Sequence, residues 1–343
     1  MNLMKKLMFC IMAAMVLFPF AVYAGGRQDR NVVVVYTPFR DEFIRPMVDA
    51  FEAETGIRVE LTFAGTGVLT GRIRAEAANP IADVLWGGML PTVVPAIYLF
   101  ENHTSINEPY MQPGFRNVEG PITRFNLNAS VLMVNTQQLP AHIQIRGYAD
   151  LLHPDLRGRI AMTDPGTSAS SFDHLVNQLY AMGNGNPEAG WEYMEAFIRN
   201  VDGIMMGSSS AVINSVAAGE HWVGLTFEEG PMPHVMAGAP IEVVYMEEGV
   251  IFQPDGIHIV RNAPNIDNAR RFVDFVTGRD IQLMMDHNLS RRTVRNDIPP
   301  GAPGNPRTLR PMAQINVIES DLARTLANRD VWLARFQQLW DQI

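Results

Sequence analysis

Three short segments of the sequence combine glycine with serine or threonine hydroxyls: residues 64–67 (AGTG), 164–171 (DPGTSASS) and 207–210 (GSSS). Each follows a run typical of a strand and comes before a pattern typical of a helix. The first N–H groups of a helix have no partner inside it, so a helix start with glycine and hydroxyls suits an anion. N-capping alone explains any single segment, but three of one design favour a shared anion site.

Such segments, at the carboxyl ends of strands, are where ligands bind in open α/β sheets. Tyr36 and Thr37 end the first predicted strand, and Trp86 ends the third, so these side chains could face the ligand or pack inside the protein. The candidate ligand-binding residues from this reasoning are Tyr36, Thr37, Gly65, Thr66, Gly67, Trp86, Thr167, Ser168, Ser170, Ser171, Ser208 and Ser209.

Two adjacent carboxylates, Glu228 and Glu229, follow a predicted strand at 223–226. They could accept hydrogen bonds from ligand hydroxyls or an ammonium group, hold a metal ion, or be solvated loop acids. The patterns of a serine-hydrolase elbow, a zinc-protease helix and a phosphate-binding P-loop are missing from the sequence. We therefore expect a binding protein that uses no cofactor, and not an enzyme.

The first 24 residues have the features of a secretory signal peptide. Lys5 and Lys6 come before an apolar run at 7–20, and small residues precede a cleavage position after Ala24. A membrane anchor is the alternative, but the run is shorter than the roughly 20 apolar residues that span a bilayer. We expect export to the periplasm without stable membrane insertion.

Cleavage would leave a chain with neither lysine nor cysteine, because both lysines and the one cysteine, Cys10, lie in the signal peptide. The net charge of −9 for the whole chain then becomes more negative by two. An acidic balance argues against nucleic acid and anionic membranes as partners. A chain of this length can bury enough surface to fold without disulfides, and it suggests two lobes.

The order of predicted elements alternates strands with helices, which is typical of an α/β protein. The predicted strands are 32–35, 57–63, 82–85, 130–135, 159–162, 204–206, 223–226, 241–245 and 256–260. The predicted helices are 41–55, one opened by 65–67, 168–182, 191–200, 209–218, 268–277, 281–288 and one from 315 to the end.

We expect the chain to cross between two lobes near 121–128 and again near 247–255. One lobe would hold residues 31–124 with 252–343, and the other residues 125–251. One large doubly wound sheet is the alternative architecture.

Several motifs resemble periplasmic ABC-importer binding proteins of the group that includes receptors for ferric iron, 2-aminoethylphosphonate, thiamine and hexose phosphate. The likeness spans about residues 31–298. The motifs are VYTP (35–38), FEAETGI (51–57), AGTG (64–67), NPIADVLWGG (79–88), LLHPDLRGRI (151–160), DPGTSASS (164–171), GEHWVGLTFEE (219–229) and PDG (254–256). The resemblance implies the type II, or Venus flytrap, periplasmic-binding-protein fold, with two α/β sheets joined by a two-strand hinge.

The resemblance further implies a monomer that delivers a small anionic solute to an ABC importer permease in the inner membrane. Ferric-binding members commonly place two tyrosines after the strand that here ends at Thr226, but this chain has Phe227-Glu228-Glu229. The segments SSFDH and LTFEEG look closest to the hexose-phosphate type. We expect a sugar phosphate or phosphonate; the alternative is iron(III), with Glu228 and Glu229 as metal ligands.

Overall fold

The computed structural model describes residues 31–343, apart from 118–119, 204, 300, 302–304 and 306. The predicted signal peptide lies outside the described residues. Within the described part of the chain, no helix is both long and apolar enough to cross a membrane.

The first layer is built from strands β1 (Val32–Thr37), β2 (Arg58–Phe63) and β3 (Val84–Met89). β1 lies between the other two and pairs with both in parallel. Helices α2 (Asp41–Thr55) and α3 (Thr66–Ala75) connect them, as predicted. The α2 helix ends where Gly56 takes the left-handed conformation at φ 67° and donates its N–H to the Glu52 carbonyl.

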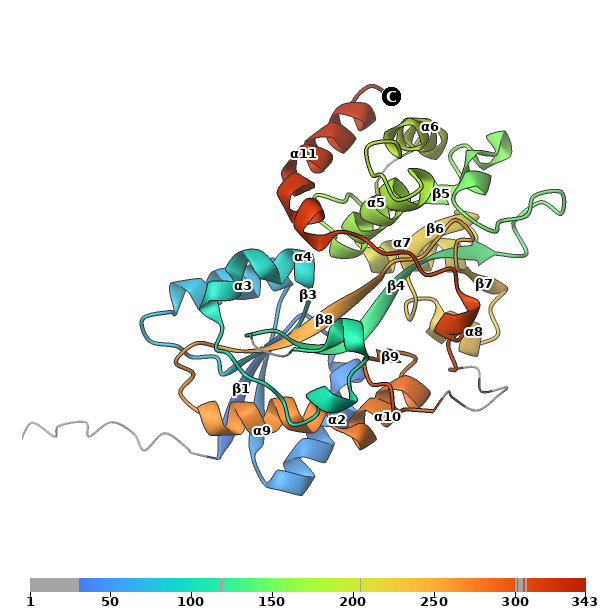
Figure 1. Ribbon diagram of the computed structural model, residues 1–343. Helices are drawn as coiled ribbons and strands as arrows, with labels where there is room; N and C mark the ends of the chain where they lie inside the picture. Colours follow the sequence, from blue (N-terminus) through green and yellow to red (C-terminus); the bar gives the residue numbers. More distant parts are fainter. Residues whose placement is uncertain (1–30, 118–119, 204, 300, 302–304, 306) are drawn as a thin grey trace, which may run out of the picture.

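Two strands, β4 (Thr123–Asn135) and β8 (Phe252–Ile259), run between the two halves of the molecule (Figure 1). The first half of β4 pairs with β8, which also pairs with β3. The second half of β4 pairs with β6 (Val223–Phe227) and β7 (Ile241–Val244). These strands are the two predicted crossings, and their pairing links the described strands in the order β2-β1-β3-β8-β4-β6-β5.

The second layer surrounds β6, β7 and the short strand β5 (Ile160–Ala161). Helices α5 (Ala169–Met182), α6 (Trp191–Val201) and α7 (Ser209–Ala217) lie on it, within one or two residues of the predicted bounds. The predicted strand at 204–206 is wrong at Met206, which forms only an isolated bridge with Thr163; residue 204 lies outside the described part.

The remaining elements complete the two halves. They are α4 (Leu90–Val93), η1 (Val94–Leu99), η2 (Glu108–Tyr110), η3 (Pro113–Phe115), η4 (Ala149–Leu152), η5 (Pro154–Leu156), α8 (Met232–Met236), α9 (Ile266–Val276), α10 (Arg279–Asn288), β9 (Arg292–Thr293), η6 (Met312–Gln314) and α11 (Leu322–Trp340).

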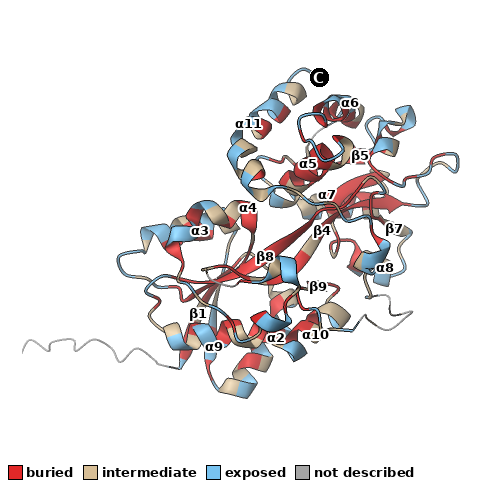
Figure 2. Cartoon of the chain, viewed as in Figure 1, coloured by how far each residue is buried: buried red, intermediate tan, exposed pale blue. Residues whose placement is uncertain are grey.

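Each half has its own large hydrophobic core (Figure 2). In the first, Trp86 packs edge-on against Phe125 and Phe272 at centroid distances of 5.2 and 5.1 Å. In the second, Tyr193 stacks on Phe197 at 5.9 Å. Separate cores joined by two strands are what a hinged, two-lobed protein needs, and no single core of a doubly wound sheet unites them.

The last helix packs on the other lobe from the one predicted. The sequence predicts that residues 252–343 belong to the first lobe, but Trp332 and Phe336 of α11 are buried in the core of the second. The Trp332 ring lies 6.5 Å from Tyr180 of α5, and its Nε1 donates to Glu188 at 3.3 Å. An apolar stripe shows that a helix must pack, but several faces of the protein can accept it.

Candidate functional site

A cleft of about 1200 Å³ lies between the two lobes. All three hydroxyl segments predicted from the sequence reach it. The residues predicted to bind ligand that line it are Gly65, Thr66, Gly67, Thr167, Ser168, Ser170, Ser208, Ser209 and Glu229.

The N-termini of α5 and α7 meet on the second-lobe wall of the cleft. Ser168 caps α5 by accepting the Ser171 N–H at 3.4 Å, and Ser208 caps α7 by accepting the Ala211 N–H at 3.1 Å. The hydroxyl oxygens of Ser170 and Ser209 lie 2.7 Å apart and join the two helix starts. Both helices present their positive dipole ends and several hydroxyl donors to the same space, which suits an anion.

The first lobe contributes the start of α3. Gly65 is its N-cap residue and makes no side-chain cap, because it has no side chain. A Cβ placed on Gly65 or Gly67 would meet nothing within 4 Å, so the backbone borders open space. Gly88 lets Thr66 approach β3 closely, since a Cβ there would lie 2.6 Å from the Thr66 methyl carbon. A third helix start therefore enters the cleft with its backbone uncovered.

Sequence reasoning missed the cations of the cleft. Among the described residues, four arginines line the cleft: Arg40, Arg291, Arg307 and Arg329. The last three lie in the C-terminal part of the chain, after α10. The guanidinium of Arg329, on α11, lies 5.0 Å from the Phe172 ring centroid. One signal was available: without lysine after residue 24, any cation that meets an anion must be an arginine or a histidine.

Glu229 is a cleft carboxylate whose side chain is 11% exposed, and it forms an ion pair with Arg291. Burial raises the pKa of Glu229 to about 7; Arg291 opposes the rise, while Asp255 and Glu228 add to it. Its Oε2 atom has no hydrogen-bond partner among the described residues, which agrees with a carboxyl that readily takes a proton. The ion pair with Arg291 favours the charged form of Glu229, whereas burial favours the neutral form. The unpartnered Oε2 atom supports the raised pKa.

The neighbouring Glu228 lies outside the cleft, which corrects its assignment as a ligand-binding residue. It is 2 % exposed, and its carboxylate accepts hydrogen bonds from Arg292 at 2.8 Å and from the Tyr245 hydroxyl. Both glutamates lie in the turn that follows β6, which ends at Phe227, and only Glu229 lines the cleft. Glu228 forms a structural ion pair.

Four other predicted residues are also buried away from the cleft. The Tyr36 hydroxyl donates to Glu76 at 3.1 Å, and the Thr37 hydroxyl donates to the Trp86 carbonyl at 2.7 Å. The Trp86 ring belongs to the first core, and the Ser171 hydroxyl donates to the Thr163 carbonyl. All four side chains are buried and none lines the cleft, so these assignments were wrong.

The cleft offers little to a metal ion. In the described ranges, the cluster of His, Cys, Asp or Glu found close enough to hold an ion is His142, His153 and Asp155, and it does not line the cleft. Tyrosine is likewise missing from the described lining of the cleft.

The sequence profile described as "Bacterial extracellular solute-binding protein" matches residues 32–287, three-quarters of the chain. The chain belongs to this family. A Salmonella typhimurium relative named putative 2-aminoethylphosphonate-binding periplasmic protein is 24% identical over 299 residues, 82% of this chain and 84% of the relative. Iron uptake protein A1 of Synechocystis is 23% identical and matches 82% of this chain and 80% of its own length.

Among solved structures, the solute-binding protein resembles the periplasmic binding protein AfuA from Actinobacillus pleuropneumoniae with exogenous fructose-6-phosphate bound. The TM-score is 0.78 at 22% identity, covering 91% of this chain and 99% of that one. This likeness confirms the predicted two-lobed fold. Together with the relatives, it identifies the chain as a solute-binding protein of the ABC-importer type, whose homologues are periplasmic.

Proposed function

We propose that this solute-binding protein captures a small phosphate- or phosphonate-bearing solute, such as a sugar phosphate, and delivers it unchanged to an inner-membrane permease. The observation that carries the proposal is the joining of two helix N-termini by the 2.7 Å contact between the Ser170 and Ser209 hydroxyls. A phosphoryl group has several acceptor oxygens and a negative charge, and this surface supplies donors and positive dipole ends for both.

The other wall of the cleft suits the same ligand. The start of α3 adds uncovered N–H groups and the Thr66 hydroxyl, and Arg40 adds positive charge from the same lobe. Arg329 of α11 adds a second positive charge from the second lobe. Glu229 and Asp173 are the acceptors that the hydroxyl or ammonium end of such a solute would need. Residues from both lobes would then contact one molecule, which favours closure around it.

Iron(III) is the second candidate, favoured by the names of two relatives. Ferric iron prefers phenolate and carboxylate oxygen, but Glu228 is held by Arg292 and Tyr245 outside the cleft. Glu229 alone remains of the two proposed metal ligands, and it is paired with Arg291. The described geometry therefore supports phosphate over iron.

The test is a thermal-shift titration on protein that has been unfolded, stripped of solute and refolded. The probes are fructose 6-phosphate, glucose 6-phosphate, 2-aminoethylphosphonate, inorganic phosphate and ferric citrate. A true ligand at a hundredfold excess over Kd stabilises the protein by about 2.7 kcal/mol. Stabilisation by ferric citrate alone would overturn the proposal, and so would recovery of a chemically converted phosphate ester after long incubation.

A further inference from the structure

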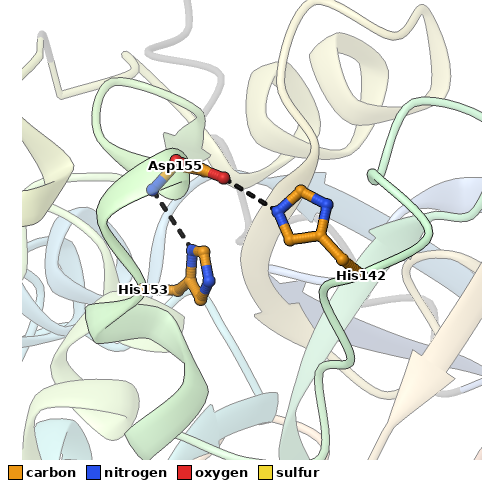
Figure 3. Close-up of side chains that lie close together, drawn as sticks. All are labelled: His142, His153 and Asp155. Atoms are coloured by element: carbon orange, nitrogen blue, oxygen red, sulfur yellow. Dashed lines mark hydrogen bonds and ion pairs between the residues drawn. The ribbon is translucent and has the colours of Figure 1, made fainter.

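A group of metal-ligating side chains lies on the surface of the second lobe, outside the solute cleft. His142, His153 and Asp155 each offer one ligand atom, and these atoms lie within 4.8 Å of one another (Figure 3). His142 Nε2 lies 2.9 Å from the Asp155 carboxylate, and the two imidazole centroids are 5.8 Å apart. The three residues come from two chain segments: His142 lies in residues 140–146, His153 lies between η4 and η5, and Asp155 lies in η5.

The backbone that carries these side chains is anchored to the core. Next to His142, the Ile143 N–H donates to the Pro140 carbonyl at 2.9 Å, and the Ile143 side chain is buried. On the other segment, the His153 carbonyl accepts the Asn200 side-chain N–H at 3.0 Å, and Leu156 is fully buried. Fixed backbones hold the ligand atoms near one another before any ion arrives, which lowers the entropy cost of binding.

The donor set indicates the kind of ion. Two imidazole nitrogens and one carboxylate oxygen suit Zn²⁺ and similar transition metals, whereas Mg²⁺ and Ca²⁺ prefer all-oxygen sets. His142 and Asp155 keep 62% and 53% of their side-chain surface exposed, so water can fill the remaining coordination positions. Within the described residues, no arginine forms an ion pair with Asp155 that would compete for its carboxylate.

We propose that His142, His153 and Asp155 form a surface site for a divalent transition-metal ion such as Zn²⁺. The site joins two segments of the second lobe and is separate from solute capture.

The test is calorimetric titration of Zn²⁺, with Mg²⁺ in parallel, into EDTA-treated protein without a polyhistidine tag. We expect one Zn²⁺ per chain and no Mg²⁺ binding. His142→Ala, His153→Ala and Asp155→Asn should each weaken Zn²⁺ affinity at least about tenfold, because the loss of a direct ligand exceeds the effect of an outer-shell change. Circular dichroism of the metal-free variants checks that each is folded.

The matched control is His103→Gln. His103 also pairs with a carboxylate, Asp274, at 3.3 Å, but belongs to no group of three candidate ligands among the described residues. This variant should bind Zn²⁺ like the wild type. The proposal would be overturned if the wild type did not bind Zn²⁺. It would also be overturned if the His142→Ala and His153→Ala variants bound Zn²⁺ with the affinity of the wild type.

Discussion

Ser170 and Ser209 are separated by 39 positions in the chain, yet their hydroxyl oxygens lie 2.7 Å apart. Each is in the first turn of its helix, so the contact brings together the N-termini of α5 and α7, whose caps satisfy only some of the free N–H groups. Ser168 lies within 3.4 Å of both hydroxyls and extends the cluster. The pair therefore fixes the part of the cleft in which we expect the anionic group of the solute.

Ser170→Ala should weaken binding of the phosphorylated solute about tenfold, because a hydrogen bond to a charged group contributes about 1.5–3 kcal/mol. Calorimetric titration of the best phosphate ester measures the change. Thr136→Ala is the control, since Thr136 is an exposed hydroxyl residue that bonds the Pro240 carbonyl outside the cleft. Equal affinity of the Ser170→Ala variant and the control would contradict the placement of the anion.

Gly65→Ala should lower solute affinity without lowering stability. The added methyl meets nothing within 4 Å in the described structure, and φ is −64°, so the fold accepts it while the solute is crowded. Gly71→Ala on the same helix is the control: its methyl is also free of contacts, and it should stabilise by about 0.5–1 kcal/mol without affecting affinity. Measurements of Tm and of the Kd for the solute in both variants test this prediction. Unchanged affinity in Gly65→Ala would count against contact between the solute and the start of α3.

Glu228→Ala should reduce the free energy of unfolding by about 3–5 kcal/mol, since it leaves Arg292 buried without its partner. Replacing both residues, as Glu228→Leu with Arg292→Met, should recover part of that loss because no lone charge remains. Urea unfolding measures each variant. If Glu228→Ala kept full stability but lost solute binding, Glu228 would be a ligand-binding residue. Its assignment as a structural ion-pair partner would then be wrong.

Glu229 should make stability fall as the pH rises from about 4.5 to about 7. Burial raises its pKa to about 7 in the folded protein. In this window the unfolded chain releases the proton and the folded protein keeps it, so raising the pH favours unfolding. Unfolding free energies of the wild type and Glu229→Gln are compared from pH 5 to pH 8, and the wild-type curve should fall relative to that of the variant as the pH rises. Parallel curves would contradict the raised pKa.

Solute binding should close the two lobes, because they are joined through β4 and β8 and line the cleft from both sides. Small-angle scattering should show a smaller radius of gyration at saturating phosphate ester. The Ser170→Ala variant at the same solute concentration should show less closure. An unchanged radius in saturated wild type would argue against a hinge.

The sequence by itself determined the local elements and the chemistry of the cleft's helix starts. The periodicity of apolar residues gave the bounds of α2 and most other helices, because helix formation depends on near neighbours. The three hydroxyl segments could be found for the same reason, because a helix N-cap depends only on residues within one turn of the helix start. The family resemblance also followed from the motifs and their order along the sequence.

Tertiary structure alone decided which side chains line the cleft. Glu228 and Glu229 are identical in type and adjacent, yet one is locked to Arg292 and the other lines the cleft. Arg329 reaches the cleft because α11 packs on the second lobe, which its sequence did not reveal. Local patterns fix which face of an element is apolar, but the partner of that face depends on contacts between residues far apart in the chain.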